Sequence, residues 1–149
     1  MVKTIILDAG PLGLLADTRT IPVVVACKQW ANDLLAAGHQ LIVPEIADYE
    51  VRRELLRMRR TASVALLDQY VTRFVYHGIT TAIMRRAAEL WAIARQIGQP
   101  TAGNNTIDGD IILIALAESL AAPNAVIATT NVGHIARFFP AELWSNITP

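Results

Sequence analysis

The stretch Thr4–Leu12, TIILDAGPL, decides the expected fold of the chain. Ile5–Leu7 form an apolar, β-prone run without polar alternation, which predicts a parallel strand covered on both faces. Asp8 follows this run directly, and a turn at Gly10 and Pro11 ends the strand. An ionised carboxylate beside a dry interior is costly unless hydrogen bonds, a cation or water receive it. The sequence therefore predicts a compensating group at the end of the first strand.

The composition predicts a globular chain that forms a single domain over residues 1–149. Hydrophobic residues make up 53% of the chain, a high share that indicates a surface buried against a partner. Lys and Arg together number 13, as do Asp and Glu together, so a nucleic-acid site would have to be a local patch.

Three further features predict a soluble cytoplasmic protein without a membrane partner. Cys27 is the single cysteine, which excludes an intramolecular disulfide and suits a reducing compartment. No apolar run approaches the ~18 residues of a membrane span. Asp8 and Asp17 interrupt the N-terminal apolar stretch, which argues against a signal peptide.

Strand-like and helix-like segments alternate along the chain, which predicts an α/β fold around a mainly parallel sheet. Short apolar runs predict strands at 3–8, 40–43, 73–76 and 125–128, with a last edge strand at 143–147. Helices are expected at 12–16, 23–37, 45–57, 61–70, 81–97 and within 129–135. Residues 100–106 are expected to form a polar loop, and Asp108 to cap a further helix.

The helix at 81–97 has the clearest boundaries. Thr80 is its expected cap and Gly98 its expected stop, as Gly38 is for the helix at 23–37. The three–four spacing of apolar residues predicts one buried face, made of Ile83, Ala87, Leu90, Trp91 and Ala94.

Oxygen-bearing side chains occur in four segments that a parallel fold brings to one edge of the sheet. Asp8 ends the first strand, Glu50 lies on the helix after the second, and Asn131 follows the fourth. Asp108 and Asp110 open the helix that precedes the fourth strand. Because ligands of such sheets bind beyond the carboxyl ends of the strands, these side chains are the candidate site.

Each of these residues also has an ordinary structural interpretation. Asp108 and Asp110 suit the positive end of a helix, and Glu50 could pair with Arg53 in solvent. Asn131 could form a turn with its own backbone. The coincidence of the four segments is what favours a site.

If the carboxylates converge, their repulsion restricts what they can do. Two like charges ~4 Å apart repel by about 4 kcal/mol at an effective dielectric of 20. A divalent cation would relieve this, and oxygen ligands suit Mg²⁺ or Mn²⁺. Such a metal activates water and neutralises charge on a phosphodiester, so Asp8, Glu50, Asp108 and Asp110 are the predicted metal ligands.

Other catalytic patterns are absent from the sequence. It contains no G-x-S-x-G elbow, no P-loop and no G-x-G-x-x-G fingerprint. The histidines His39, His77 and His134 are scattered, and His134 alone lies near the candidate site, where a supporting role is expected.

A basic run follows Glu50 immediately. The segment 51–60, VRRELLRMRR, carries Arg52, Arg53, Arg57, Arg59 and Arg60. Such a run is often only a solvated helix face. Because arginine suits phosphate and a candidate metal ligand lies next to it, the run could instead guide an RNA backbone to the site.

Four segments together resemble a PIN-domain ribonuclease of the VapC toxin type. They are IILDAGPL at 5–12, VPEIADYEVRREL at 43–55, IDGDIILIALA at 107–117 and IATTNVGHIARF at 127–138. Each segment is short, and their order and spacing over nearly the whole chain carry the specificity. The resemblance implies a three-layer α/β/α sandwich and metal-dependent endonucleolytic cleavage of RNA.

The resemblance also implies roles for single residues. It places Asp8, Glu50 and Asp110 at the three acidic positions, with Asp108 as an accessory. Three positions depart from the pattern. Asn131 and His134 stand where acids are common, and Gly10 where a small hydroxyl or amide residue is common.

The toxin group further implies a homodimer and inhibition by a small antitoxin protein. Two other functions stay open. The fold could serve as an RNA- or protein-binding module that cleaves nothing, or the acidic cluster could belong to a metal-dependent phosphatase, which would not need the arginine run.

Overall fold

The computed structural model describes residues 1–97 and 104–149, with side chains described for 1–97 and 108–149. Its centre is a five-stranded sheet in the order β3-β2-β1-β4-β5, and every pairing is parallel. The strands are β1 (Thr4–Leu7), β2 (Gln40–Pro44), β3 (Val75–His77), β4 (Ala125–Thr129) and β5 (Ala141–Leu143).

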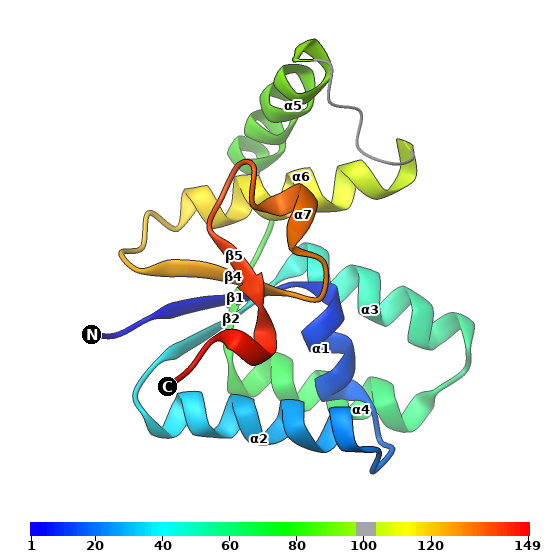
Figure 1. Cartoon of the computed structure of the whole chain (residues 1–149). Coiled ribbons are helices and arrows are strands. Elements are labelled where there is room, and N and C mark those ends of the chain that lie inside the picture. Colours follow the sequence, from blue (N-terminus) through cyan, green and yellow to red (C-terminus); the bar gives the residue numbers. More distant parts are fainter. Residues whose placement is uncertain (98–103) are drawn as a thin grey trace.

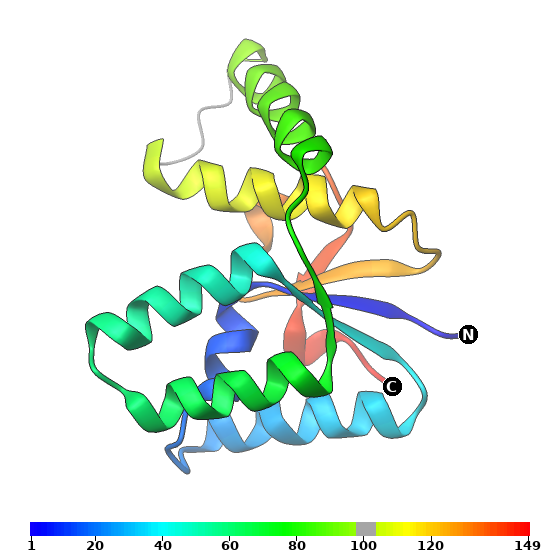
Figure 2. The ribbon, with the colours of Figure 1, turned by 180° about the vertical axis from the view of Figure 1, so that it is seen from behind.

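Helices cover both faces of this sheet (Figures 1 and 2). The helices on one side are α1 (Ala9–Ala16), α2 (Pro22–Ala36), α3 (Glu45–Arg57) and α4 (Thr61–Arg73). The other side carries α5 (Thr81–Gln96), α6 (Asn104–Ser119) and the short α7 (Val132–Ile135), and a 3-10 turn at Trp144–Asn146 follows β5. The structure confirms a three-layer α/β/α sandwich.

The first strand supplies the core on both faces. Ile5 and Leu7 pack with residues of α1 and α2, whereas Ile6 packs with residues of α5 and α6, and all three side chains are fully buried. Because successive strand residues point to opposite faces, a run without polar alternation is what a central strand of a covered sheet requires.

Most of the expected elements are confirmed. The helix at 45–57 has the bounds that the sequence predicts, and the expected strands at 40–43 and 125–128 each continue by one residue. Gly38 has a φ of +87°, the left-handed conformation that ends many helices. Thr80 caps α5, since its hydroxyl accepts a 3.2 Å hydrogen bond from the amide of Ile83. Cys27 is a free, buried thiol on α2.

Four expectations are wrong. Gly10 and Pro11 do not form a turn, because α1 already begins at Ala9. Asp108 is not a helix cap, because α6 begins at Asn104 and takes up the end of the expected loop. The last edge strand lies at 141–143, and Trp144 leaves it to pack edge-on against Trp30 of α2, with ring centroids 5.5 Å apart. Trp91 does not join the buried face of α5, since it is exposed. The stop expected at Gly98 and residues 100–103 of the loop lie outside the described residues.

The parallel sheet sets the place of the candidate site. The carboxyl ends of β1, β2 and β4 lie at one edge, in a register that pairs Leu7 with Ala128. Asp8 leaves this edge after β1, α3 starts there after β2, and Thr129 ends β4 beside Asp8. Among the described helices, none is long and apolar enough to cross a membrane.

The cap of α5 gives a first test. In Thr80→Ala the amide of Ile83 loses its side-chain acceptor, and we expect the free energy of unfolding to fall by about 1 kcal/mol. Urea denaturation measures this change, with the exposed neighbour Thr81→Ala as the matched control. Equal losses in both variants would contradict the capping role.

Candidate active site

Asp8 is held by two hydrogen bonds at the end of β1. It occupies the N-cap position of α1, where its Oδ1 accepts a 2.7 Å bond from the amide of Ala9. Its Oδ2 accepts a 2.7 Å bond from the hydroxyl of Thr129 on the neighbouring strand. These two donors offset part of the cost of placing an ionised carboxylate beside the dry interior. They also fix the orientation of the carboxylate.

Thr129 is a site residue that the sequence analysis missed. Its side chain is fully buried, and besides donating to Asp8 its Oγ1 accepts a 3.0 Å bond from the amide of Asn131. A single hydroxyl therefore joins the end of β1 to the turn after β4. The signal in the sequence was a hydroxyl residue at the end of an apolar strand, which becomes informative only once β4 is known to pair with β1.

Glu50 reaches the same edge of the sheet from α3. Its carboxylate lies against α6 at Gly109, where an added Cβ would come within 2.9 Å of Oε2, so glycine makes room for it. Burial raises the pKa of Glu50, and the negative charge of Asp8 raises it further. The positive charge of Arg53 opposes this rise in pKa, while Asp110 adds to it.

Asp110 completes the cluster from α6. Burial, and then the charge of Asp8, raise the pKa of Asp110 to about 6, and the charge of His134 opposes the rise. The structure therefore brings Asp8, Glu50 and Asp110 within electrostatic reach of one another from three separate elements. We refer to these three residues as the carboxylate cluster.

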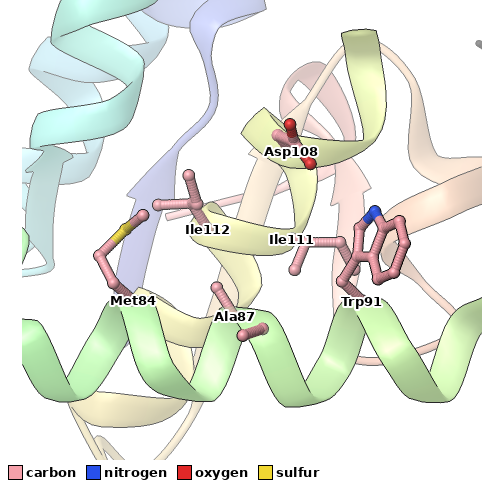
Figure 3. Close-up of a pocket in the computed structure, with 7 residues that line it drawn as sticks. Met84, Ala87, Trp91, Asp108, Ile111 and Ile112 are labelled. Carbon is pink, nitrogen blue, oxygen red and sulfur yellow. The ribbon is translucent and has the colours of Figure 1, made fainter. Parts of the chain in front are cut away.

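Asp108 is not brought into the carboxylate cluster. Residues two apart on a helix point in directions about 200° apart, so Asp108 and Asp110 lie on different faces of α6. Asp108 is exposed and lines an apolar pocket between α5 and α6, near Trp91 and Ile111 (Figure 3). Its charge is not among those that shift the pKa of Glu50 or Asp110.

The residues that depart from the family pattern surround the cluster. Asn131 is exposed, and its side chain makes no capping bond to α7, so the turn is bonded through Thr129 instead. His134 lies within charge reach of Asp110, and its buried Nδ1 has no hydrogen-bond partner among the described residues. At Gly10 an added Cβ would come within 2.5 Å of Oγ1 of Thr130, so a side chain fits only if Thr130 moves.

The arginine run divides into paired and unpaired charges. Arg52 makes ion pairs with Asp48 and Asp68 at 2.9 and 2.8 Å, and Arg57 pairs with Glu54. These contacts support the solvated-face interpretation for both arginines. Arg53 has a different environment, because its guanidinium carbon lies 5.0 Å from the centre of the Tyr49 ring.

The donor chemistry of the cluster fits a hard divalent cation, because all three side chains offer carboxylate oxygens and repel one another. Within the described part of the chain, no group of three or more His, Cys, Asp or Glu side chains is arranged to hold a metal ion.

Three solved structures have the same architecture. VapBC2 from Rickettsia felis, bound to a DNA fragment from their promoter, matches with a TM-score of 0.66 at 18% identity, over 95% of this chain and 98% of that chain. VapBC-1 from nontypeable Haemophilus influenzae matches with a TM-score of 0.67 at 19% identity, over 96% and 99%. DNA-bound VapBC from Salmonella typhimurium matches with a TM-score of 0.64 at 17% identity, over 97% and 99%.

No family model and no curated protein matches the chain by sequence. At this low identity the structural neighbours establish the fold. The chain has the PIN-like fold of VapC-type proteins, and the resemblance that its four sequence segments indicate is confirmed at that level.

The raised pKa of Asp110 predicts how stability depends on pH. Its carboxyl binds a proton more tightly in the folded chain than in the unfolded chain, where the reference pKa is 3.8. The contribution of Asp110 to stability should therefore fall as the pH rises from about 4 to about 6, and stay lower above that range.

Asp110→Asn removes this titration. The difference between 3.8 and about 6 corresponds to ~3 kcal/mol, and solvent screening reduces the expected gain in unfolding free energy at pH 7.5 to roughly 1–2 kcal/mol. Urea denaturation in EDTA at pH 4.5 and 7.5 measures it, with the exposed Asp108→Asn as the matched control. A gain of the same size in Asp108→Asn would contradict the clustering of charges around Asp110.

The Thr129 hydroxyl gives a third test. Thr129→Val keeps the shape of the side chain but removes the donor to Asp8 and the acceptor for the amide of Asn131, so we expect a loss of about 1–3 kcal/mol in stability. Thr129→Ser keeps the hydroxyl and should lose less than the valine variant. Urea denaturation measures both losses. If Thr129→Ser were less stable than Thr129→Val, the threonine would stabilise the fold through packing of its methyl group rather than through its hydrogen bonds.

Proposed function

We propose that this protein is a metal-dependent endoribonuclease that cleaves RNA phosphodiester bonds, acting as the toxin of a toxin–antitoxin pair. One observation carries the proposal, namely the convergence of Asp8, Glu50 and Asp110 at the carboxyl edge of a PIN-like sheet. Three half-buried carboxylates, two of which (Glu50 and Asp110) have their pKa raised by burial and by the charge of Asp8, are unfavourable in an isolated fold. A function that uses their charge explains why they occur together.

The proposed cofactor is Mg²⁺ or Mn²⁺, held by Asp8, Glu50 and Asp110. When bound, the cation would activate water and neutralise charge on the phosphodiester. The chain's own contribution is to orient the Asp8 carboxylate through Thr129 and to seat Glu50 against Gly109. In the part of the chain that the structure describes, these side chains are not arranged as a ligand set, so binding of the cation would require them to move.

Asn131 is proposed to assist at the rim of the cluster. Its backbone amide is tied to Thr129, while its side chain is exposed and free of a capping bond to α7. An amide oxygen there could orient a water molecule without adding charge. The sequence also predicts Asp108 as a metal ligand, but Asp108 lies on another face of α6 and lines the apolar pocket. Its substitution therefore serves as a control for the substitution of Asp110.

The proposed protein partners are an antitoxin and a second copy of the chain. The structural neighbours include VapBC complexes bound to DNA, which supports a toxin–antitoxin context for this fold. The rival proposal is a PIN-like module that binds RNA or protein and cleaves nothing. The family pattern has acids at positions 131 and 134, where this chain has an amide and a histidine whose Nδ1 has no partner among the described residues. These departures favour the rival.

RNA cleavage separates the two proposals. We expect the purified chain to cleave single-stranded RNA of mixed sequence in the presence of Mn²⁺, and to stop when EDTA is added. Asp8→Asn and Asp110→Asn should lower the cleavage rate at least ~100-fold, because each removes a charge that the cation requires. Asp108→Asn should remain within a few-fold of the unmodified chain.

Calorimetry of Mn²⁺ binding provides a second measurement on the same variants. Affinity should fall at least ~10-fold in Asp8→Asn and Asp110→Asn. Binding of Mn²⁺ without any cleavage of RNA would favour the non-catalytic module. Unchanged Mn²⁺ binding in both variants would remove the metal site from the proposal.

A further inference from the structure

An exposed aromatic residue and an arginine form a stacked pair beside the carboxylate cluster. Tyr49 and Arg53 are one helical turn apart on α3, and the guanidinium carbon of Arg53 lies 5.0 Å from the centre of the Tyr49 ring. Glu50 follows Tyr49 in the chain, and the charge of Arg53 opposes the rise in the pKa of Glu50 that burial and Asp8 cause. The pair therefore lies within electrostatic reach of the cluster, on the helix that delivers one of its carboxylates.

The exposure of Tyr49 is unusual for this chain. The residue is 55% exposed, more than Tyr76 or Trp91, the other exposed aromatic residues in the described structure. Tyr76 also differs in chemistry, since its hydroxyl donates to Asp48 at 3.2 Å. A tyrosine exposed to this extent covers little of the core, so packing does not explain its place.

Arg53, unlike Arg52 and Arg57, has no carboxylate ion pair among the described residues. Arg52 is held between two aspartates and Arg57 by a glutamate, so their charges are largely neutralised. The guanidinium carbon of Arg53 lies over the Tyr49 ring, and a guanidinium has five N–H donors that can bind a further group. The pair thus offers an aromatic surface together with a cation.

We propose that Tyr49 and Arg53 form a stacking platform for one unpaired base of single-stranded RNA, next to the bond that the carboxylate cluster cleaves. This inference rests on the proposed function. It adds the residues that would hold a base of the RNA beside the carboxylate cluster. Unstacked bases of RNA bind on aromatic rings and guanidinium planes, and arginine donors suit the adjacent phosphate. Bases inside a duplex are already stacked, so the platform selects single-stranded RNA.

The chain contains a matched control for this platform. On α5, Arg95 lies 4.8 Å from the centre of the Trp91 ring, and Trp91 is 39% exposed. This second pair also places a guanidinium over an exposed aromatic ring, but its Trp91 lines the apolar pocket between α5 and α6 rather than lying beside Glu50 (Figure 3). Its loss should leave RNA binding unchanged.

The test measures binding of a single-stranded RNA 12-mer that carries 2-aminopurine, whose fluorescence is quenched by stacking. Measurements in EDTA use the full chain and prevent cleavage. Tyr49→Ala should weaken binding roughly 10-fold and reduce the quenching, while Tyr49→Phe keeps the ring and should stay within about twofold. Arg53→Gln should weaken binding and lower its salt dependence by about one released counterion.

Trp91→Ala should bind as the unmodified chain does, and the affinity for a duplex of the same sequence should not change in Tyr49→Ala. Equal binding and equal quenching by Tyr49→Ala and the unmodified chain would overturn the platform, even if the chain cleaves RNA. Binding that depends on Tyr49 in a chain that cleaves nothing with Mn²⁺ would support the platform and overturn the proposed nuclease. No binding of RNA by the unmodified chain would overturn both.

Discussion

The hydrogen bond from the hydroxyl of Thr129 to Asp8 is the constraint on which the candidate site depends. It crosses from β4 to β1 at 2.7 Å, between a fully buried side chain and a half-buried carboxylate. Because the same hydroxyl accepts from the amide of Asn131, one buried group orients the first carboxylate and the turn that follows the fourth strand. The bond forms because β1 and β4 pair in parallel, which brings Thr129 beside Asp8. The orientation of the Asp8 carboxylate therefore depends on the sheet.

The negative charges of the carboxylate cluster lower the stability of the fold. Each of Glu50 and Asp110 has its pKa raised first by burial and then by the charge of Asp8. The nearby positive groups, Arg53 and His134, offset this only in part. The packing nevertheless accommodates the cluster, since Gly109 leaves space for the Glu50 carboxylate. Natural chains keep such unfavourable groupings mainly where a ligand or reaction uses them.

Helices α3 and α6 each present different chemistry on different faces. On α6, Asp110 faces the cluster while Asp108 faces an apolar pocket with Trp91. On α3, Glu50 faces the cluster, whereas Tyr49 and Arg53 stack in solvent and Arg52 pairs with two aspartates. A helix turns by about 100° per residue, so residues two apart, such as Asp108 and Asp110, point in nearly opposite directions. Charge runs in a sequence therefore overstate how many charges are available to a ligand.

The sequence alone determined the α/β class, most of the strands and helices, and the edge of the sheet at which the carboxylates meet. These features follow from local signals: apolar runs, caps such as Thr80, stops such as Gly38, and the rule that parallel strands end on one side. The tertiary structure decided the roles of Thr129 and Gly109, the exposure of Trp91 and the separation of Asp108 from Asp110. Those properties depend on which elements pack together and on the rotation of each helix, and residues distant in sequence set both.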